Sequence, residues 1–515
     1  MKKFLSVLLC VVLCLSVFAG CDQEKEEAAG TGTFQVGYGM ADVTPTESIP
    51  LDGYAGTDSA EYRRSASTEW PLQVVTIAFT DEKNQTLLFI TLDFLNAYMA
   101  DSMRDAISKE TGIPKDHIMF HVTHNHSGPS LRVDHPAIPP YINQLTGGVL
   151  NSAKTALEDR KAVTGLYTTF ARPEGCNTER HYLLADGKYQ SYAVGNVAKD
   201  QIIGHYGVAD NLLQLVKFTR EGGKDVVLVN WQGHPPSTKP TSILTANYPG
   251  VLRNYLDTNM NCLSTFMLSG SGNLNNGSQI AADIRHNDYQ ELGKNLGAAA
   301  VEAAANFTRH DLGEIRIKEK VLQLDTRDGG ARKVWLYAIS MGDFAFVTAP
   351  FEIFDDNAVA VRESSPYAMT MYASCCNGSN GYLPTPASFG WEITYESRIT
   401  EFPDGTAAIV EDALKGMVAE MASESGYTAV EKPADYYQGA FEPKSDGVTY
   451  TLVTAGDPSK VTQVANGFYA FQGVGANNKI RNFLTNDPAI ARKVVNMSTA
   501  QFLFNEQNVI VGIVE

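Results

Sequence analysis

The spacing of apolar residues changes between two periods along the first half of the chain. Residues 85–97 are almost continuously apolar, as expected for a buried strand, and residues 100–111 follow with the spacing of a helix. Residues 117–124 form a second apolar run, which predicts another strand. A strand, a helix and a strand joined by short links are typical of an α/β domain.

The same two patterns continue toward the C-terminus. Apolar residues at helical spacing predict a helix that contains Ile142, Leu145, Val149, Ala153 and Leu157. Two strands in a hairpin are expected at 211–219 and 225–231. We expect further helices at 289–307 and 407–421, and further strands at 313–324 and, as a pair, within 333–349.

The pattern changes near Pro433. Residues 429–515 hold short β-type runs at 448–453, 467–471 and 509–514 among many turn residues. We therefore expect a large α/β domain over residues 34–428 and a small β-rich region over residues 429–515.

The first residues predict an export signal. Lys2 and Lys3 precede an apolar run over 4–18, which is too short for a comfortable membrane span, and small residues lead to Cys21. This placement of Cys21 resembles a bacterial lipobox, so residues 1–20 would be cleaved and Cys21 acylated. Residues 21–33 would then tether an exported protein to the bacterial cell membrane. A plain secretory signal and an uncleaved anchor are the alternatives.

Composition narrows the class of protein further. The chain of 515 residues has 44% hydrophobic residues and a formal net charge of −17, with no basic cluster, so nucleic acid is not an expected partner. Outside the signal region the cysteines lack CxxC spacing, which disfavours a cysteine-bound zinc site. These cysteines are Cys176, Cys262, Cys375 and Cys376.

Histidines provide the first candidate chemistry. His124 and His126 lie at a predicted strand end that runs into a Ser-Gly-Pro turn. In an extended strand, residues two apart share a face, so both imidazoles would point the same way, as a zinc ligand and a proton donor require. His121 would face the opposite side and be structural. Packed, hydrogen-bonded histidines in a loop explain the spacing equally well.

Three further residues stand at the ends of predicted strands or in turns. His234 follows the strand at 225–231, and Glu352 follows the apolar strand at 344–347. A carboxylate placed there needs a metal ion or an arginine as partner, unless it is a solvated loop residue. Tyr382 lies in a glycine-rich loop that, alone, is an ordinary turn.

Together these segments resemble the catalytic domain of the neutral, non-lysosomal ceramidases over roughly residues 34 to 425. The specific motif is His124-Asn125-His126-Ser127-Gly128-Pro129, which is similar to the family's His-Thr-His-Ser-Gly-Pro block. The segments at 37–45, 92–93 and 402–406 resemble weaker family motifs. The resemblance implies a mixed-sheet α/β fold and a zinc hydrolase that cleaves the N-acyl amide bond of ceramide, or of a similar lipid, with zinc-bound water.

The resemblance also implies a site, residue by residue. His124, His234, Glu352 and Tyr382 would bind Zn²⁺. His126 and Tyr395 would hold the scissile carbonyl and the oxyanion, and Arg180 would match an arginine near the zinc. A long apolar groove beside the zinc would accept the lipid.

Some positions depart from the family pattern. Asn273 and Asn247 replace acidic residues that could shape a second ion site or the floor of the pocket, and Phe351 replaces a glycine beside Glu352. Three alternatives therefore stay open: a zinc amidase or esterase for a non-lipid substrate, an exported binding lipoprotein without catalysis, and an inactive relative.

Overall fold

A computed structural model describes residues 32–53, 63–191, 198–235, 242–277, 288–391, 394–437, 441–476 and 478–514. The predicted signal at 1–20, Cys21 and nearly all of the 21–33 tether lie outside these residues. In the described part of the chain, no helix has the length and apolarity needed to cross a membrane.

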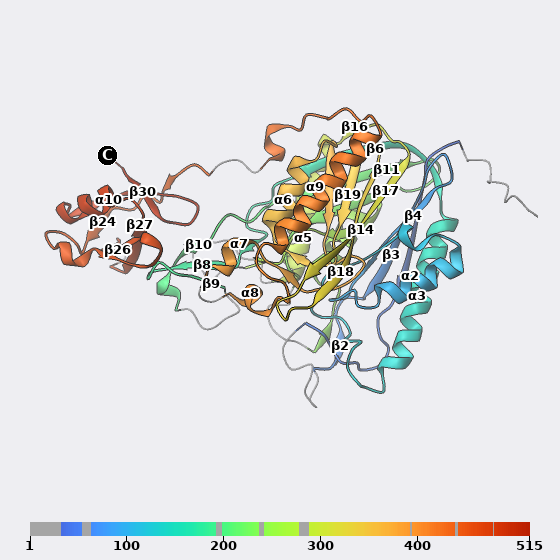
Figure 1. The fold of residues 1–515 in the computed structure, drawn as a ribbon, viewed down its shortest axis with the longest axis horizontal. Coiled ribbons are helices and arrows are strands. Elements are labelled where there is room, and N and C mark those ends of the chain that lie inside the picture. Colours follow the sequence, from blue (N-terminus) through green and yellow to red (C-terminus); the bar gives the residue numbers. More distant parts are fainter. Residues whose placement is uncertain are drawn as a thin grey trace, which may run out of the picture.

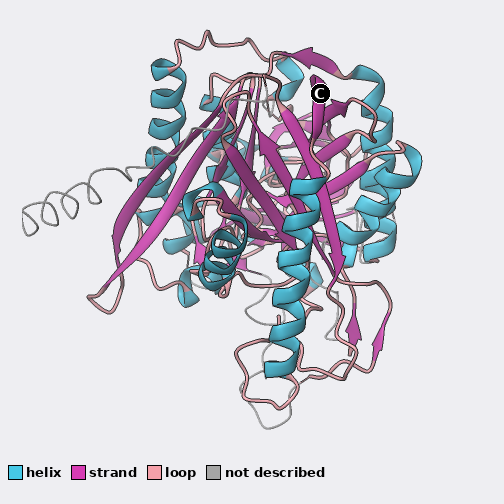
Figure 2. Ribbon diagram, turned by 90° about the vertical axis from the view of Figure 1, so that its right-hand side faces the viewer, coloured by secondary structure: helices cyan, strands magenta, loops and turns pink. Residues whose placement is uncertain are grey.

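Two sheets packed face to face form the centre of the molecule (Figures 1 and 2). The larger one has nine strands among the described residues, in the order β14-β12-β11-β6-β1-β3-β4-β5, with β16 paired to β6. Its strands are β1 (Gln35–Asp42), β3 (Gln73–Thr80), β4 (Thr86–Leu92), β5 (Ile118–Val122), β6 (Lys161–Ala171), β11 (Leu213–Arg220), β12 (Val226–Trp231), β14 (Leu263–Leu268) and β16 (Thr308–His310).

The smaller sheet has the order β17-β18-β19-β21. Its strands are β17 (Ile315–Asp325), β18 (Ala331–Met341), β19 (Phe344–Thr348) and β21 (Met369–Ala373). Side chains of β3, β4, β11 and β12 meet those of β18, β19 and β21 in one apolar core between the sheets. Burial on both faces explains why β4 and β5 are apolar over most of their length rather than alternating.

Helices cover the outer face of each sheet (Figure 2). On the larger sheet, α2 (Ala100–Thr111) and α3 (Ile138–Glu158) pack over one part, and α4 (Asn247–Asn259) and α5 (Tyr289–Ala303) over another. On the smaller sheet, α6 (Asp355–Ser364) and α9 (Thr406–Glu424) pack on the side away from the first sheet. The result is a four-layer α/β/β/α arrangement.

Residues 444–513 contain an eight-stranded sheet among the described residues, beside the main body (Figure 1, red). Its elements are β23 (Lys444–Ser445), β24 (Tyr450–Leu452), β25 (Thr462–Gln463), β26 (Tyr469–Val474), β27 (Ile480–Thr485), α10 (Pro488–Lys493), β28 (Thr499–Ala500), β29 (Phe502–Phe504) and β30 (Ile510–Ile513). It contacts a three-stranded sheet of β8 (His181–Leu184), β9 (Tyr189–Ser191) and β10 (Ile202–His205) through a shared apolar cluster.

The predicted fold class is confirmed, as a mixed α/β fold with a β-rich C-terminal region. The predicted helix at 100–111 matches α2, and β4 and β5 pair in parallel on either side of it. The predicted hairpin is formed by β11 and β12, which pair antiparallel. The domain boundaries at 428 and 429 stay a prediction.

Candidate functional site

The predicted site residues follow the carboxyl ends of strands from both sheets. His124 and His126 follow β5, His234 follows β12, and Glu352 follows β19. Glu352 pairs with Tyr382 in a short parallel ladder, β20 (Glu352–Ile353) with β22 (Tyr382–Leu383). In α/β sheets this edge is where ligands bind, because loops from neighbouring strands meet there.

A turn, rather than a strand, brings His124 and His126 together. β5 ends at Val122, and His124 has a left-handed φ of 60°. The Asn125 amide fixes this turn by donating to the carbonyl oxygens of Asp93, at 3.1 Å, and Thr245, at 2.7 Å. The prediction that strand alternation aligns the two imidazoles is therefore wrong, although their ring centroids do lie 5.1 Å apart.

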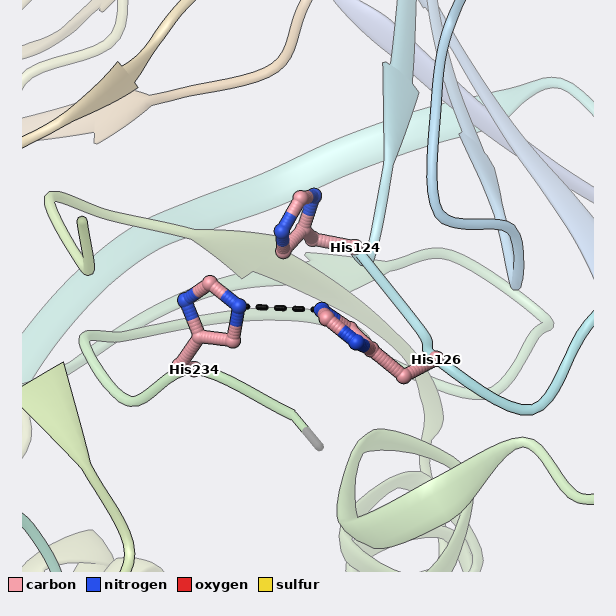
Figure 3. A group of neighbouring side chains, drawn as sticks. All are labelled: His124, His126 and His234. Atoms are coloured by element: carbon pink, nitrogen blue, oxygen red, sulfur yellow. Dashed lines mark hydrogen bonds between the residues drawn. The ribbon is translucent and has the colours of Figure 1, made fainter. Parts of the chain in front are cut away.

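His234 joins these two rings to form the imidazole cluster: His124, His126 and His234 (Figure 3). One ligand nitrogen from each ring lies within 4.8 Å of the others. His126 Nε2 is 2.9 Å from His234 Nε2, and the His124 and His234 ring centroids are 4.6 Å apart. Tyr248 and Asn276 position His234, through the Gly233 and His234 carbonyl oxygens respectively.

Each ring of the cluster has a backbone carbonyl at its other nitrogen. His124 Nδ1 lies 2.9 Å from Leu95 O, His126 Nδ1 2.7 Å from Gly53 O, and His234 Nδ1 3.3 Å from Ser271 O. Because a carbonyl only accepts hydrogen bonds, this arrangement favours a proton on each Nδ1. The Nε2 atoms of all three rings then converge, as in rings oriented for metal binding.

Glu352 brings a carboxylate to the same point. Its Oε2 lies 3.1 Å from His124 Nε2, and neither of these buried atoms makes a hydrogen bond with good geometry. Although burial disfavours a charged ring, Glu352 and Cys375 raise the pKa of His124 well above its ordinary value. Burial and the neighbouring His124 lower the pKa of His126 to about 3 and that of His234 well below its usual range.

Ring nitrogens and a carboxylate that converge at one buried point need a cation there, either a proton, as the raised pKa of His124 indicates, or a metal ion. Neutral imidazoles and a carboxylate are ligands for divalent metals, and buried lone pairs that face one another are otherwise unfavourable. The imidazole cluster with Glu352 therefore fits a metal ion.

The remaining predicted residues lie around Glu352. Burial, together with the nearby Glu352 carboxylate, raises the pKa of the Tyr382 hydroxyl well above its usual value. The Arg180 guanidinium carbon lies 5.3 Å from the Tyr382 ring centroid, and the Tyr395 ring centroid 5.7 Å from it. The structure thus gathers His124, His126, His234, Glu352, Tyr382, Tyr395 and Arg180 in one place. His121 is buried elsewhere, where its Nε2 accepts a hydrogen bond from Leu268 N at 3.1 Å.

Sequence reasoning did not assign a second buried network, the Glu396 network, which consists of Arg180, Glu396, His181, Glu179 and Asn273. Glu396 accepts from Arg180 Nε at 2.7 Å and contacts His181 Nε2 at 2.9 Å. His181 Nδ1 lies 2.6 Å from Glu179 Oε1. The only sequence feature that could have indicated this network is the run of three consecutive charged or titratable residues, Glu179-Arg180-His181. The Asn273 amide donates to both Glu179 and Asp355, so this departure from the family pattern places a donor between two acids.

A pocket of about 400 Å³ opens beside the imidazole cluster, between α2 and α3. Apolar side chains line most of it, including Phe94, Met99, Met103, Leu131 and Ile142. Its lining includes sequence neighbours of the residues whose carbonyls hold two of the rings: Phe94 and Asn96 flank Leu95, and Asp52 precedes Gly53. Arg132, which lies 3.8 Å over the Tyr98 ring, is also part of the lining.

The four cysteines in the described part of the chain are free and buried. Cys375 lies beside the site, with its Sγ 3.8 Å from His124 Nδ1. The pairing of cysteines that the sequence left open is therefore absent among these described residues.

Comparisons with known proteins place this fold. Neither protein-family profiles nor curated sequences match the chain. Solved structures with a similar fold include neutral ceramidase from Pseudomonas aeruginosa, at 14% identity and a TM-score of 0.61 over 86% of this chain and 84% of that one. They also include a ceramidase complexed with C2, at 14% identity and a TM-score of 0.61 over 92% of this chain and 91% of that one. The predicted resemblance is confirmed as a likeness of fold.

Proposed function

We propose that this chain is a zinc-dependent hydrolase that cleaves the N-acyl amide bond of ceramide or of a similar N-acyl lipid. The observation that carries the proposal is the convergence of His124, His126, His234 and Glu352, which bring one ring nitrogen each and a carboxylate to one buried point. The ceramidase-like fold supports the choice of reaction.

We assign zinc to His124, His234 and Glu352, with the Tyr382 oxygen as the fourth ligand. Imidazole nitrogens and carboxylate oxygens are zinc's usual ligands in hydrolases. When bound, zinc supplies Lewis acidity, which polarises a carbonyl and makes water acidic near neutral pH. The Nδ1 contacts to Leu95 and Ser271 orient two of these ligands.

The other residues act on the amide. His126 is held through Nδ1 by Gly53 O, so its Nε2 faces the reacting group and can receive a proton and return it to the leaving amine. Tyr395, next to Tyr382, would donate to the oxyanion that forms at the carbonyl. One such donor lowers the activation free energy by about 2.7–4 kcal/mol.

The apolar pocket supports a lipid acyl group as part of the substrate. Its volume of about 400 Å³ falls in the range of small-molecule sites, roughly 300–1,000 Å³. An acyl chain there would lie along α2 with its carbonyl toward His124 and His126. A lipid substrate also agrees with the proposed export and anchoring through acylated Cys21, which rest on the sequence alone.

A substrate panel tests this proposal. Purified protein with its native metal is incubated with long-chain ceramide and with short N-acyl amides and esters, and free fatty acid is measured. We expect faster release from ceramide than from the short amides. Turnover of short amides or esters alone would point to a non-lipid hydrolase, and no turnover with ligand retention would favour a binding protein.

A further inference from the structure

The Glu396 network forms a buried row of alternating charges behind the metal-binding residues. It begins at Arg180, whose Nε and Nη2 both contact Glu396 Oε1, at 2.7 and 2.6 Å. The second carboxylate oxygen, Oε2, faces His181 Nε2 at 2.9 Å. Glu396 is fully buried, so each of its oxygens needs a protein donor.

His181 lies between two carboxylates, one at each ring nitrogen. Its Nδ1 is 2.6 Å from Glu179 Oε1 and its Nε2 is 2.9 Å from Glu396 Oε2. Ionised carboxylates only accept hydrogen bonds, so both nitrogens must carry protons. The ring is 1% exposed, and the geometry therefore requires an imidazolium cation inside the protein.

Asn273 closes the far end of the row. Its Nδ2 donates to Glu179 Oε2 and, at 2.6 Å, to Asp355 Oδ1, while its Oδ1 accepts from Asp355 N at 3.0 Å. Both oxygens of Glu179 are thereby engaged, and this carboxylate cannot turn away from His181. An aspartate at 273 would place an acceptor where this donor now lies.

We propose that His181 is a positioning residue for the hydrolytic site. Its imidazolium holds Glu396 in the one orientation that presents Oε1 to Arg180, and the Arg180 guanidinium carbon in turn lies 5.3 Å from the centroid of the Tyr382 ring. Glu396 also directly follows Tyr395, so a fixed Glu396 sets both tyrosines that adjoin Glu352. This role rests on the proposed function, whereas the imidazolium state of His181 does not depend on it.

A purely structural ion pair would affect folding but not the chemical step. The test is His181→Asn, with His205→Asn as the matched control. His205 lies on the neighbouring strand β10, and its ring contacts Tyr182. We expect kcat with ceramide to fall roughly 10- to 100-fold in His181→Asn, as for other outer partners of metal sites, with zinc retained and KM within about twofold. The control should keep the wild-type kcat. Unchanged kcat in His181→Asn, or an equal loss in both variants, would overturn the proposal.

A second measurement does not depend on the variant folding or on turnover. Histidine-selective ¹⁵N NMR of the zinc-loaded wild-type protein at pH 8 should contain a ring with both nitrogens protonated, assigned to His181 by its proximity to Trp391, whose ring centroid is 4.9 Å away. A neutral ring at this position would refute the inference. A wild-type protein inactive on every amide would instead refute the proposed function, and the NMR result would stand separately.

Discussion

Two buried polar clusters lie side by side in this protein and differ in how their charges are balanced. In the Glu396 network, each carboxylate of Glu179 and Glu396 faces a donor from Arg180, His181 or Asn273. In the imidazole cluster with Glu352, atoms that can act as metal ligands lie against one another: His126 Nε2 is 2.9 Å from His234 Nε2, and His124 Nε2 is 3.1 Å from Glu352 Oε2.

The difference separates a framework from a binding site. A buried network whose donors and acceptors match holds its own geometry, since each unpaired partner would be costly. Buried ring nitrogens and a carboxylate that converge on one point are stabilised by a cation at that point, and a metal ion from outside can supply it. The Glu396 network therefore contains its own cations, Arg180 and His181, whereas the imidazole cluster with Glu352 is suited to bind a metal ion.

The largest expected effect comes from removing a metal ligand of the imidazole cluster. His234→Ala should lose zinc and lower kcat/KM by roughly 10³-fold or more, because the cation that balances the cluster is lost. Metal analysis and ceramide turnover check this. His310→Ala is the matched control, since His310 contacts Thr168 on β6 and Asp343 in the turn between β18 and β19 and its loss should leave both quantities unchanged.

Removing His126 shows whether this residue transfers a proton to the leaving amine or binds zinc as a third imidazole ligand. With the role assigned above, His126→Ala keeps one zinc per chain but loses roughly 10²- to 10³-fold in kcat, because proton transfer to the leaving amine fails. Zinc content and kcat are measured on the same sample. Loss of zinc in this variant would make His126 a third imidazole ligand instead.

The Glu396 network should make the free energy of unfolding depend on pH. Burial lowers the pKa of His181, but Glu179 and Glu396 outweigh it and raise that pKa to about 9. A raised pKa means that the folded state binds the proton more tightly, so this stabilisation is complete below about 6.5 and is lost as pH rises through about 9. Protonated His181 thereby contributes about 3 kcal/mol to the free energy of unfolding.

Denaturant unfolding of wild type and His181→Asn at pH 6.5 and 9.5 measures this contribution. The gap between the two proteins should shrink at the higher pH. Burial raises the pKa of Glu396, but Arg180 and His181 lower it to about 2, so this second contribution is lost as pH falls from about 4.5 toward 2. A gap that does not depend on pH would contradict an imidazolium at His181.

The smallest expected effect is on substrate binding in the apolar pocket beside the imidazole cluster. Ala106 lines this pocket roughly 10 Å along α2 from Met99. Ala106→Leu should raise KM for a long-chain amide roughly 10-fold and leave a short-chain amide unchanged, because added bulk fills the distal part of the pocket. Lys109→Leu, on the exposed face of α2, controls for added bulk. Equal KM changes for both chain lengths would place the acyl chain elsewhere.

Sequence patterns predicted the sheets and helices well because burial dictates them. The largely apolar runs of β4 and β5 and the periodicity of α3 follow directly from packing between layers. The residues of the site were predicted from the family resemblance, since His234, Glu352 and Tyr382 are distant in sequence and only the fold brings them to His124.

The local geometry was beyond the reach of pattern rules. Strand alternation predicted the wrong reason for the convergence of His124 and His126, because a left-handed His124 in a turn depends on the Asn125 contacts to two other segments. The role of Asn273 was equally inaccessible, because its two acidic partners lie at 179 and 355.

Zinc quantification of the purified wild-type protein and of His234→Ala tests the central claim most directly. We predict one tightly bound zinc ion per wild-type chain and none in the variant. A wild-type protein that is fully active without a divalent metal, or a variant that keeps one zinc per chain, would contradict the assignment of this cluster as a metal site.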